Sequence, residues 1–281
     1  MANYNNRTKV FFKSVKLPKQ YTPENRGLDE CCCSFMVFAS DSTDSWKNQK
    51  TSAWIPKADF IEFELIKSDG TIIPQTAIEF PNQLDAYYCT VDWYTILADY
   101  GSDCYELKVT YTVAGVSDFF TWGKYDLIPY NLKRLNGWVA LQTTFDSNQT
   151  IEGINFAGAN VVDCINFHGW FGERKTNTVV ENLIYSTREA RKVYRENLNS
   201  YELKADSVME CISNKLLDLH LLSENNLLVS DFNAYNHTYK YLSFPVIVEE
   251  SPNVTYKTRK ATITCKVGDK FKNSRSKYGL Q

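Results

Sequence analysis

The chain has 281 residues, of which 43% are hydrophobic, 23% charged and 14% aromatic. Forty Phe, Trp and Tyr side chains require a buried core, and only 12 Gly and 8 Pro are present. This composition excludes a largely disordered, collagen-like or low-complexity chain. A formal net charge of −2 gives no reason to expect specific nucleic-acid binding. No stretch approaches the ~20 apolar residues of a membrane span, so we expect no membrane partner.

The first half of the chain has the pattern of β structure. Short apolar or alternating runs bounded by polar turn residues predict strands. A hairpin is expected at Ser68-Asp69-Gly70, because Gly supplies the positive φ of a tight turn. Val91–Tyr100 is the ambiguous piece and fits a short helix before Gly101. The expected strands are Lys9–Leu17, Cys32–Ala39, Phe60–Ile66, Ala86–Val91 and Tyr105–Val113.

A change of pattern at Leu127–Asn136, with Pro129 and a basic pair, places a domain boundary near residue 130. Beyond it, Asn166–Gly172 (NFHGWFG) is expected to be an aromatic-rich turn. Ser207 and Glu210 have the spacing of a capping box, which predicts an amphipathic helix from about 207 to 222. The expected strands are Trp138–Phe145, Val161–Phe167, Val179–Tyr185, Arg191–Leu203, Leu227–Val229, Lys240–Glu249 and Ala261–Val267.

These elements predict a mainly β protein with two β-sandwich-like domains, at 1–130 and 131–281, and one amphipathic helix in the second. The near-zero net charge conceals an asymmetry. Residues 1–130 contain 12 basic and 17 acidic residues, whereas the remainder contains 19 basic and 16 acidic residues. Eight basic residues lie in Lys257–Lys277, so the C-terminal segment is a candidate partner-contact arm for an acidic surface. The residues proposed for this arm are Lys270, Lys272, Arg275 and Lys277.

No set of residues with recognisable chemistry is present. The sequence has no phosphate-binding loop, no GxSxG or HExxH motif and no CxxC pair, and its three histidines are too few for a convincing zinc site. His168 is read as a packing neighbour of Cys164, and His220 as a surface or boundary residue of the helix. We therefore expect no catalytic, cofactor-binding or metal-binding residues. The eight cysteines are expected to be free, mostly buried thiols.

Three stretches resemble tail structural proteins of the crAss-like phages that infect Bacteroidales. They are Cys33–Ile55, Gly153–Tyr185, and a C-terminal order of helix, NNLLVSDFNAYNHTY, FPVIV and VGDKFKN. The resemblance is to distal-tail or tail-ring subunits. It covers about two-thirds of the chain as a pattern of spacing and residue type, and no sharp motif carries it.

The resemblance implies a non-enzymatic virion protein that forms a six- or twelve-fold ring around the tail axis. Its partners would be copies of itself and other tail proteins, and it would be assembled in the bacterial host cytoplasm without a cofactor. A carbohydrate-binding β-sandwich for host adsorption is the alternative, because Trp and Tyr side chains could stack on sugars. An unrecognised β-class hydrolase ranks third. Ring subunits would bury aromatic residues between protomers, whereas a glycan reader would expose them in a cleft.

Overall fold

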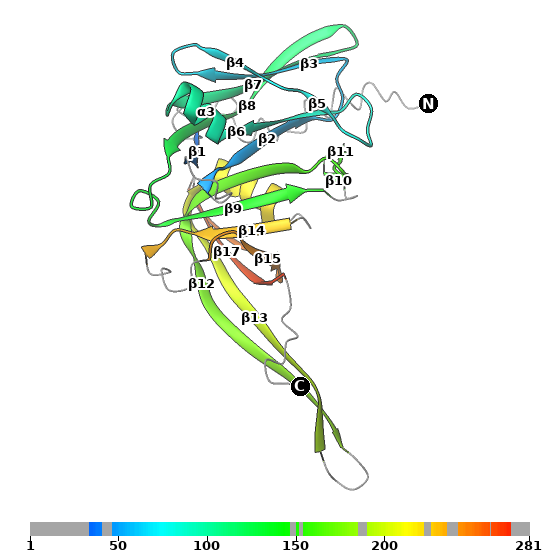
Figure 1. The fold of residues 1–281 in the computed structure, drawn as a ribbon, viewed down its shortest axis with the longest axis vertical. Coiled ribbons are helices and arrows are strands. Elements are labelled where there is room, and N and C mark those ends of the chain that lie inside the picture. The colour runs from blue at the N-terminus through cyan, green and yellow to red at the C-terminus, as the bar shows by residue number, and fades with distance from the viewer. Residues whose placement is uncertain are drawn as a thin grey trace.

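The structure is a computed structural model, and it describes residues 34–40, 47–146, 150–151, 154–184, 190–221, 226–234, 241–258 and 260–270. The strand expected at Lys9–Leu17 lies outside these residues. Two packed sheets form one end of the molecule, a barrel-like sheet forms its middle, and a long two-stranded hairpin extends from the opposite end (Figure 1). The mainly β fold predicted from the sequence is confirmed.

The first sheet has five strands in the order β1-β8-β7-β3-β4. Its long central strands alternate buried and exposed residues, because one face covers the core and the other faces solvent. The turn between β3 and β4 contains Gly70 at φ 87°, as the Asp-Gly pair predicts. The bounds are β1 Ser34–Ala39, β3 Phe60–Lys67, β4 Ile72–Gln75, β7 Cys104–Val113 and β8 Val116–Pro129.

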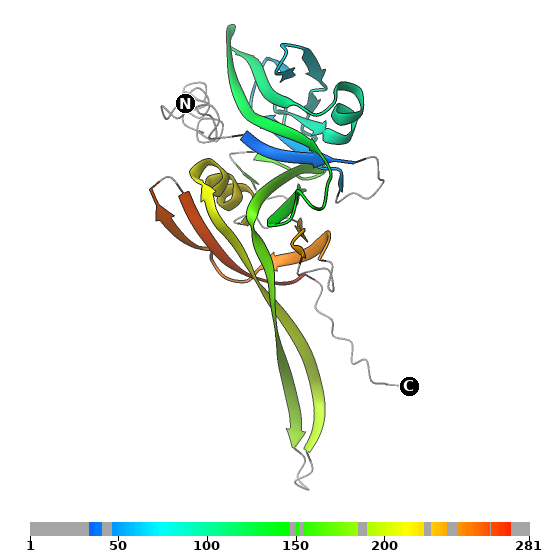
Figure 2. The same cartoon turned by 90° about the vertical axis from the view of Figure 1, so that its left-hand side faces the viewer.

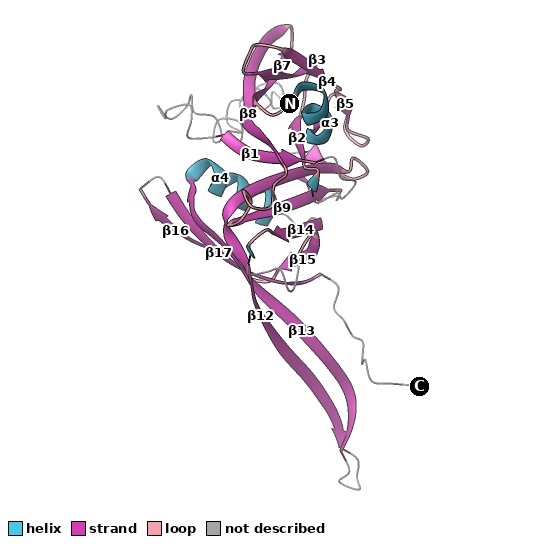
Figure 3. Ribbon diagram, turned by 60° about the vertical axis from the view of Figure 1, so that its left-hand side comes forward, coloured by secondary structure: helices cyan, strands magenta, loops and turns pink. Residues whose placement is uncertain are grey.

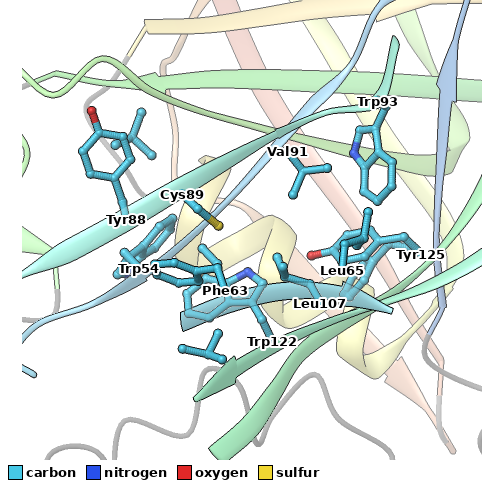
Figure 4. Packing of buried hydrophobic residues seen from close by; sticks show 14 of the residues in the cluster. Trp54, Phe63, Leu65, Tyr88, Cys89, Val91, Trp93, Leu107, Trp122 and Tyr125 are labelled. Carbon is cyan, nitrogen blue, oxygen red and sulfur yellow. The ribbon is translucent and has the colours of Figure 1, made fainter. Parts of the chain in front are cut away.

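A three-stranded sheet, ordered β2-β6-β5, packs against the first to form a sandwich. Its strands are β2 Lys50–Ile55, β5 Ile78–Glu79 and β6 Tyr87–Asp92. The ambiguous segment is the helix α3, Trp93–Tyr100, where the Asp92 side chain accepts a hydrogen bond from the amide of Tyr94. Trp54, Trp93 and Trp122 lie between the layers, among the aliphatic side chains shown in Figure 4.

The C-terminal part contains a barrel-like sheet. Its strand order is β13-β12-β9-β14-β15-β17-β16, and additional pairing of β13 with β17 joins the ends of a six-stranded circuit. The bounds are β9 Trp138–Phe145, β12 Val161–Ile184, β13 Ala190–Met209, β14 Asn226–Asp231, β15 Phe244–Val248, β16 Asn253–Lys257 and β17 Lys260–Asp269. A short ribbon of β10, Thr150–Ile151, and β11, Ile154–Asn155, follows β9.

The predicted helix exists, but it begins later than expected. The α-helix α4, Glu210–Lys215, continues as a π-helical turn η4, Leu216–Leu221. The prediction of a capping box at Ser207 was wrong. Ser207 has φ 53° within an irregularity of β13, and the residue that precedes the helix, Met209, makes no side-chain capping hydrogen bond. Figure 3 shows α4 between β1 and the strands β16 and β17.

The expectation of a turn at Asn166–Gly172 was also wrong, because the whole segment belongs to β12. Phe167 and Phe171 fill the barrel, and Gly169 lies where a Cβ would overlap the backbone carbonyl of Lys204. A glycine in a strand interior can mark such a close approach as well as a turn.

The hydrophobic core of the sandwich continues across the expected domain boundary. Residues from the C-terminal part, including Phe145, Phe156, Val161 and Leu219, belong to the same buried cluster as Trp54. The division at residue 130 stays a prediction: these residues join the core of the sandwich, and the barrel encloses a second buried cluster of its own. Neither described helix has the length and apolar character needed to cross a membrane.

Candidate functional site

The hairpin formed by β12 and β13 is the most prominent surface feature. β12 pairs with β9 only through His168, and β13 pairs with β17 only from Ser200 onward. Between Lys175↔Ser200 and Ile184↔Ala190 the two strands pair with each other. The nine residues of β12 and ten of β13 beyond the barrel span about 30 Å at roughly 3.3 Å per residue of β12. Residues 176–184 and 190–199 are called the arm, and Figure 2 shows it extending away from the barrel.

A free two-stranded ribbon is marginally stable by itself, and its outer edges offer unpaired backbone groups to another chain. The arm sequence contains apolar residues typical of a packed strand, including Val179, Val180 and Val193. It also contains the basic residues Arg191 and Lys192. The backbone arrangement and this sequence together make the arm a candidate surface for association.

A hydrogen-bond network holds the base of the arm to the barrel. The Asn199 side chain donates to Asp269 Oδ2 at 2.8 Å, and its Oδ1 accepts from Arg174 Nε at 3.1 Å and from Thr176 Oγ1 at 2.8 Å. Beneath it, Phe171, Tyr201, Tyr241 and Phe244 pack ring against ring, with centroids 5.1–6.1 Å apart. Both contacts fix the direction in which the arm leaves the barrel.

The second feature is a charged cluster buried between the sandwich and the barrel. Asp163 of β12 lies 2.8 Å from Lys215 Nζ and 3.3 Å from His220 Nε2, through the same carboxylate oxygen. His220 Nδ1 lies 2.8 Å from the Thr143 hydroxyl of β9. The exposed fractions of Asp163, Lys215 and His220 are 0%, 3% and 0%, so the helix delivers two polar side chains into the core.

The same cluster reaches the sandwich. The amide of Ser52 in β2 donates to Asp163 Oδ1 at 3.3 Å, and the Ser52 hydroxyl donates to the Val162 carbonyl at 2.6 Å. Lys215 Nζ lies 4.9 Å from the centroid of the Phe35 ring in β1. One carboxylate therefore connects β2, the barrel and the helix.

Burial and charge act against each other at these groups. Burial alone would raise the pKa of Asp163, but the Lys215 ammonium and the His220 hydrogen bond lower it below its ordinary value. Burial lowers the pKa of His220, and the nearby Asp163 only partly opposes this. The cluster at neutral pH therefore contains an ionised carboxylate, an ammonium group and a neutral imidazole.

The order Thr143, His220, Asp163 has the connectivity of a hydroxyl–imidazole–carboxylate triad. A nucleophile must contact its substrate, yet each of these side chains is 0% exposed. In this arrangement no substrate reaches the Thr143 hydroxyl. The geometry suits a structural connection between parts of the chain.

A pair of amides forms a second connection at the same joint. Gln49 Nε2 donates to Asn166 Oδ1 at 2.8 Å, and Asn166 Nδ2 donates to Gln49 Oε1 at 2.7 Å. Each also satisfies the free edge of β1: the Phe38 amide donates to Gln49 Oε1, and Asn166 Nδ2 donates to the Met36 carbonyl. These contacts protect a strand edge that would otherwise be open.

The basic residues of the C-terminal segment, which were expected to contact a partner, are only partly described. Lys270 lies at the end of β17, where its amide donates to the Pro245 carbonyl and its ammonium contacts Asn226 Oδ1. Lys272, Arg275 and Lys277 lie outside the described residues. The reading of His220 as a surface or boundary residue was wrong, because its side chain is fully buried.

Sequence reasoning missed both the arm and the buried cluster. The helix sequence held one signal for the buried cluster: the charged residue Lys215 lies next to the apolar residue Leu216. In the described part of the chain, no three His, Cys, Asp or Glu side chains gather as a metal site. In comparisons with known proteins, no family model matches the chain and no curated protein matches its sequence.

Proposed function

We propose that this protein is a non-enzymatic structural subunit that assembles with copies of itself into a ring of a phage tail. The arm carries this proposal. A ribbon of two strands, anchored at its base by Asn199 and free along both backbone edges in the described structure, gains stability when it packs against another subunit. The resemblance of the sequence to tail-ring subunits supplies the proposed setting, the virion tail assembled in the host cytoplasm.

Charge asymmetry supports a head-to-tail contact. The described part of residues 34–130 contains six lysines and twelve Asp or Glu residues. The C-terminal segment Lys257–Lys277 is strongly basic. Contact between the acidic sandwich of one subunit and the basic segment of the next would join two different surfaces, and a closed ring is one product of such contacts.

Shortening the arm tests the proposal. Replacing residues 177–198 with Asn-Gly joins Thr176 to Asn199, which already face each other in the register, through a two-residue turn. The barrel pairings lie outside the deleted residues, so we expect a folded variant with the wild-type melting temperature. Light scattering and negative-stain images should show an annular oligomer for the full chain. The variant should be a monomer, with a mass below the 32.4 kDa of one full chain.

Two outcomes would contradict the proposal. One is a full chain that stays monomeric at tens of micromolar, and the other is a shortened variant that still forms the same rings. A monomeric full chain whose melting temperature rises with added sugar would instead favour the glycan-binding alternative. A triple reversal, Lys272→Glu, Arg275→Glu and Lys277→Glu, tests the charge contact separately: weaker assembly supports it, and unchanged rings exclude it.

A further inference from the structure

The buried cluster has no net charge when His220 is neutral, and one added proton would give it a positive charge. Asp163 Oδ2 lies 2.8 Å from Lys215 Nζ and 3.3 Å from Nε2 of a neutral His220, whose Nδ1 lies 2.8 Å from the Thr143 hydroxyl. The cluster in this state carries no excess charge. A second proton on the imidazole would add a positive charge to a region where all three side chains are buried.

That charge would be a second cation beside one carboxylate. Lys215 already supplies a cation from α4, and Lys215 and His220 lie next to the same oxygen of Asp163. The other titratable side chains near Asp163 are Tyr125 of β8 and Cys164 of β12. Burial raises the pKa of Tyr125 far above its ordinary value and that of Cys164 to about 12, so both stay neutral in acid.

We propose that Asp163, Lys215 and His220 form a pH-sensitive latch, in which protonation of His220 loosens the joint at β2 and α4 before the sheets themselves unfold. The contacts that open are the Ser52 amide on Asp163 Oδ1 and the helix side chains on Asp163 Oδ2. The Gln49–Asn166 amide pair does not titrate, and it holds the neighbouring edge of β1.

The sign follows from the depressed pKa of His220 in the folded chain. The closed latch is fully favoured above the unfolded-state pKa of about 6.5. As the pH falls below that value, an open state in which the imidazole meets water binds one more proton than the closed state. The opening equilibrium therefore rises by up to about tenfold per pH unit until the folded-state pKa is reached.

The Ser52 amide is a local reporter, because it donates to Asp163 rather than to a strand of its own sheet. We would measure amide hydrogen exchange by NMR between pH 7.5 and 5, corrected for the intrinsic pH dependence of exchange. In the wild type, protection of Ser52 should fall by up to about tenfold per pH unit below 6.5. Amides of the β3–β7 ladder should keep their protection.

The variant His220→Gln supplies the comparison, because its side-chain amide can donate to Asp163 and accept from Thr143 but does not titrate. Its Ser52 protection should be independent of pH. His168→Gln is the matched control, since His168 is exposed and stacks on Trp138, and it should behave as the wild type. Should His220→Gln fail to fold, the imidazole resonances of the wild type replace it, because the chain has only three histidines.

Three results would overturn the latch. They are the same pH dependence of Ser52 exchange in His220→Gln and wild type, simultaneous loss of Ser52 and β3–β7 protection, and an imidazole of His220 that titrates at the ordinary value without any change at Ser52. The latch is supported if His220 titrates below pH 6.5 and the exchange of the Ser52 amide rises over the same pH range.

Discussion

Replacing Asp163 by Asn tests how strongly the buried ion pair is coupled. The substitution keeps the side-chain size but removes the charge, and it places an amide nitrogen or an uncharged oxygen 2.8 Å from Lys215 Nζ. Lys215 is 3% exposed, so its ammonium would remain buried without a counter-ion. Removing one partner of a buried ion pair costs about 3–5 kcal/mol. At about 4 kcal/mol, the folded-to-unfolded ratio falls roughly a thousandfold.

The double variant Asp163→Asn, Lys215→Met shows how much of the lost stability comes from leaving the Lys215 ammonium buried without a counter-ion. Methionine keeps an unbranched side chain against Phe35 and removes the uncompensated ammonium. We expect the double variant to be at least about 2 kcal/mol more stable than Asp163→Asn alone, because replacing both partners of a buried pair is far less costly than breaking it. Urea unfolding at pH 7.5 measures all four proteins of this cycle.

The result that would refute this reasoning is additivity. If Asp163→Asn lost less than about 1 kcal/mol, or if the two substitutions simply summed, Asp163 and Lys215 would not be energetically coupled. The buried charge would then be tolerated by some other arrangement of the joint.

Two further substitutions test the packing. Trp54→Ala should lower the free energy of unfolding by about 3–5 kcal/mol, because the buried indole packs on Trp122 at 5.0 Å, and urea unfolding measures this against the control Leu84→Ala at an exposed site. Gly169→Ala should cost about 1–3 kcal/mol by forcing β12 away from the Lys204 carbonyl; an unchanged unfolding midpoint in urea would contradict the close approach.

Local patterns were sufficient for most individual strands. β9 has the predicted bounds, and β7 differs by one residue. In β7 the alternation of apolar and polar residues in the sequence matches the alternation of buried and less buried residues along most of the strand. α3 follows from Asp92 as a cap and Gly101 as a terminator. These features depend on residues that are close together in the sequence, so one sequence is sufficient to predict them.

Features set by distant partners were not predictable. Asn166–Gly172 was expected to be an aromatic-rich turn, but it lies within β12. Gly169 is required there by the backbone of Lys204 in β13, 35 residues further on. Ser207 and Glu210 matched a capping box, yet β13 continues to Met209 because it pairs with β17. His220 looked like a surface residue because nothing near it in sequence indicates Asp163.

The core of the sandwich includes residues from the C-terminal part, and this has a consequence for synthesis on the ribosome. Trp54 is made early, but its buried cluster is complete only when Leu219 has emerged, 165 residues later. At roughly 5–20 residues per second this interval lasts about 10–30 s. During that time part of the sandwich core lacks its cover, so we expect a fragment ending near residue 130 to be prone to aggregation.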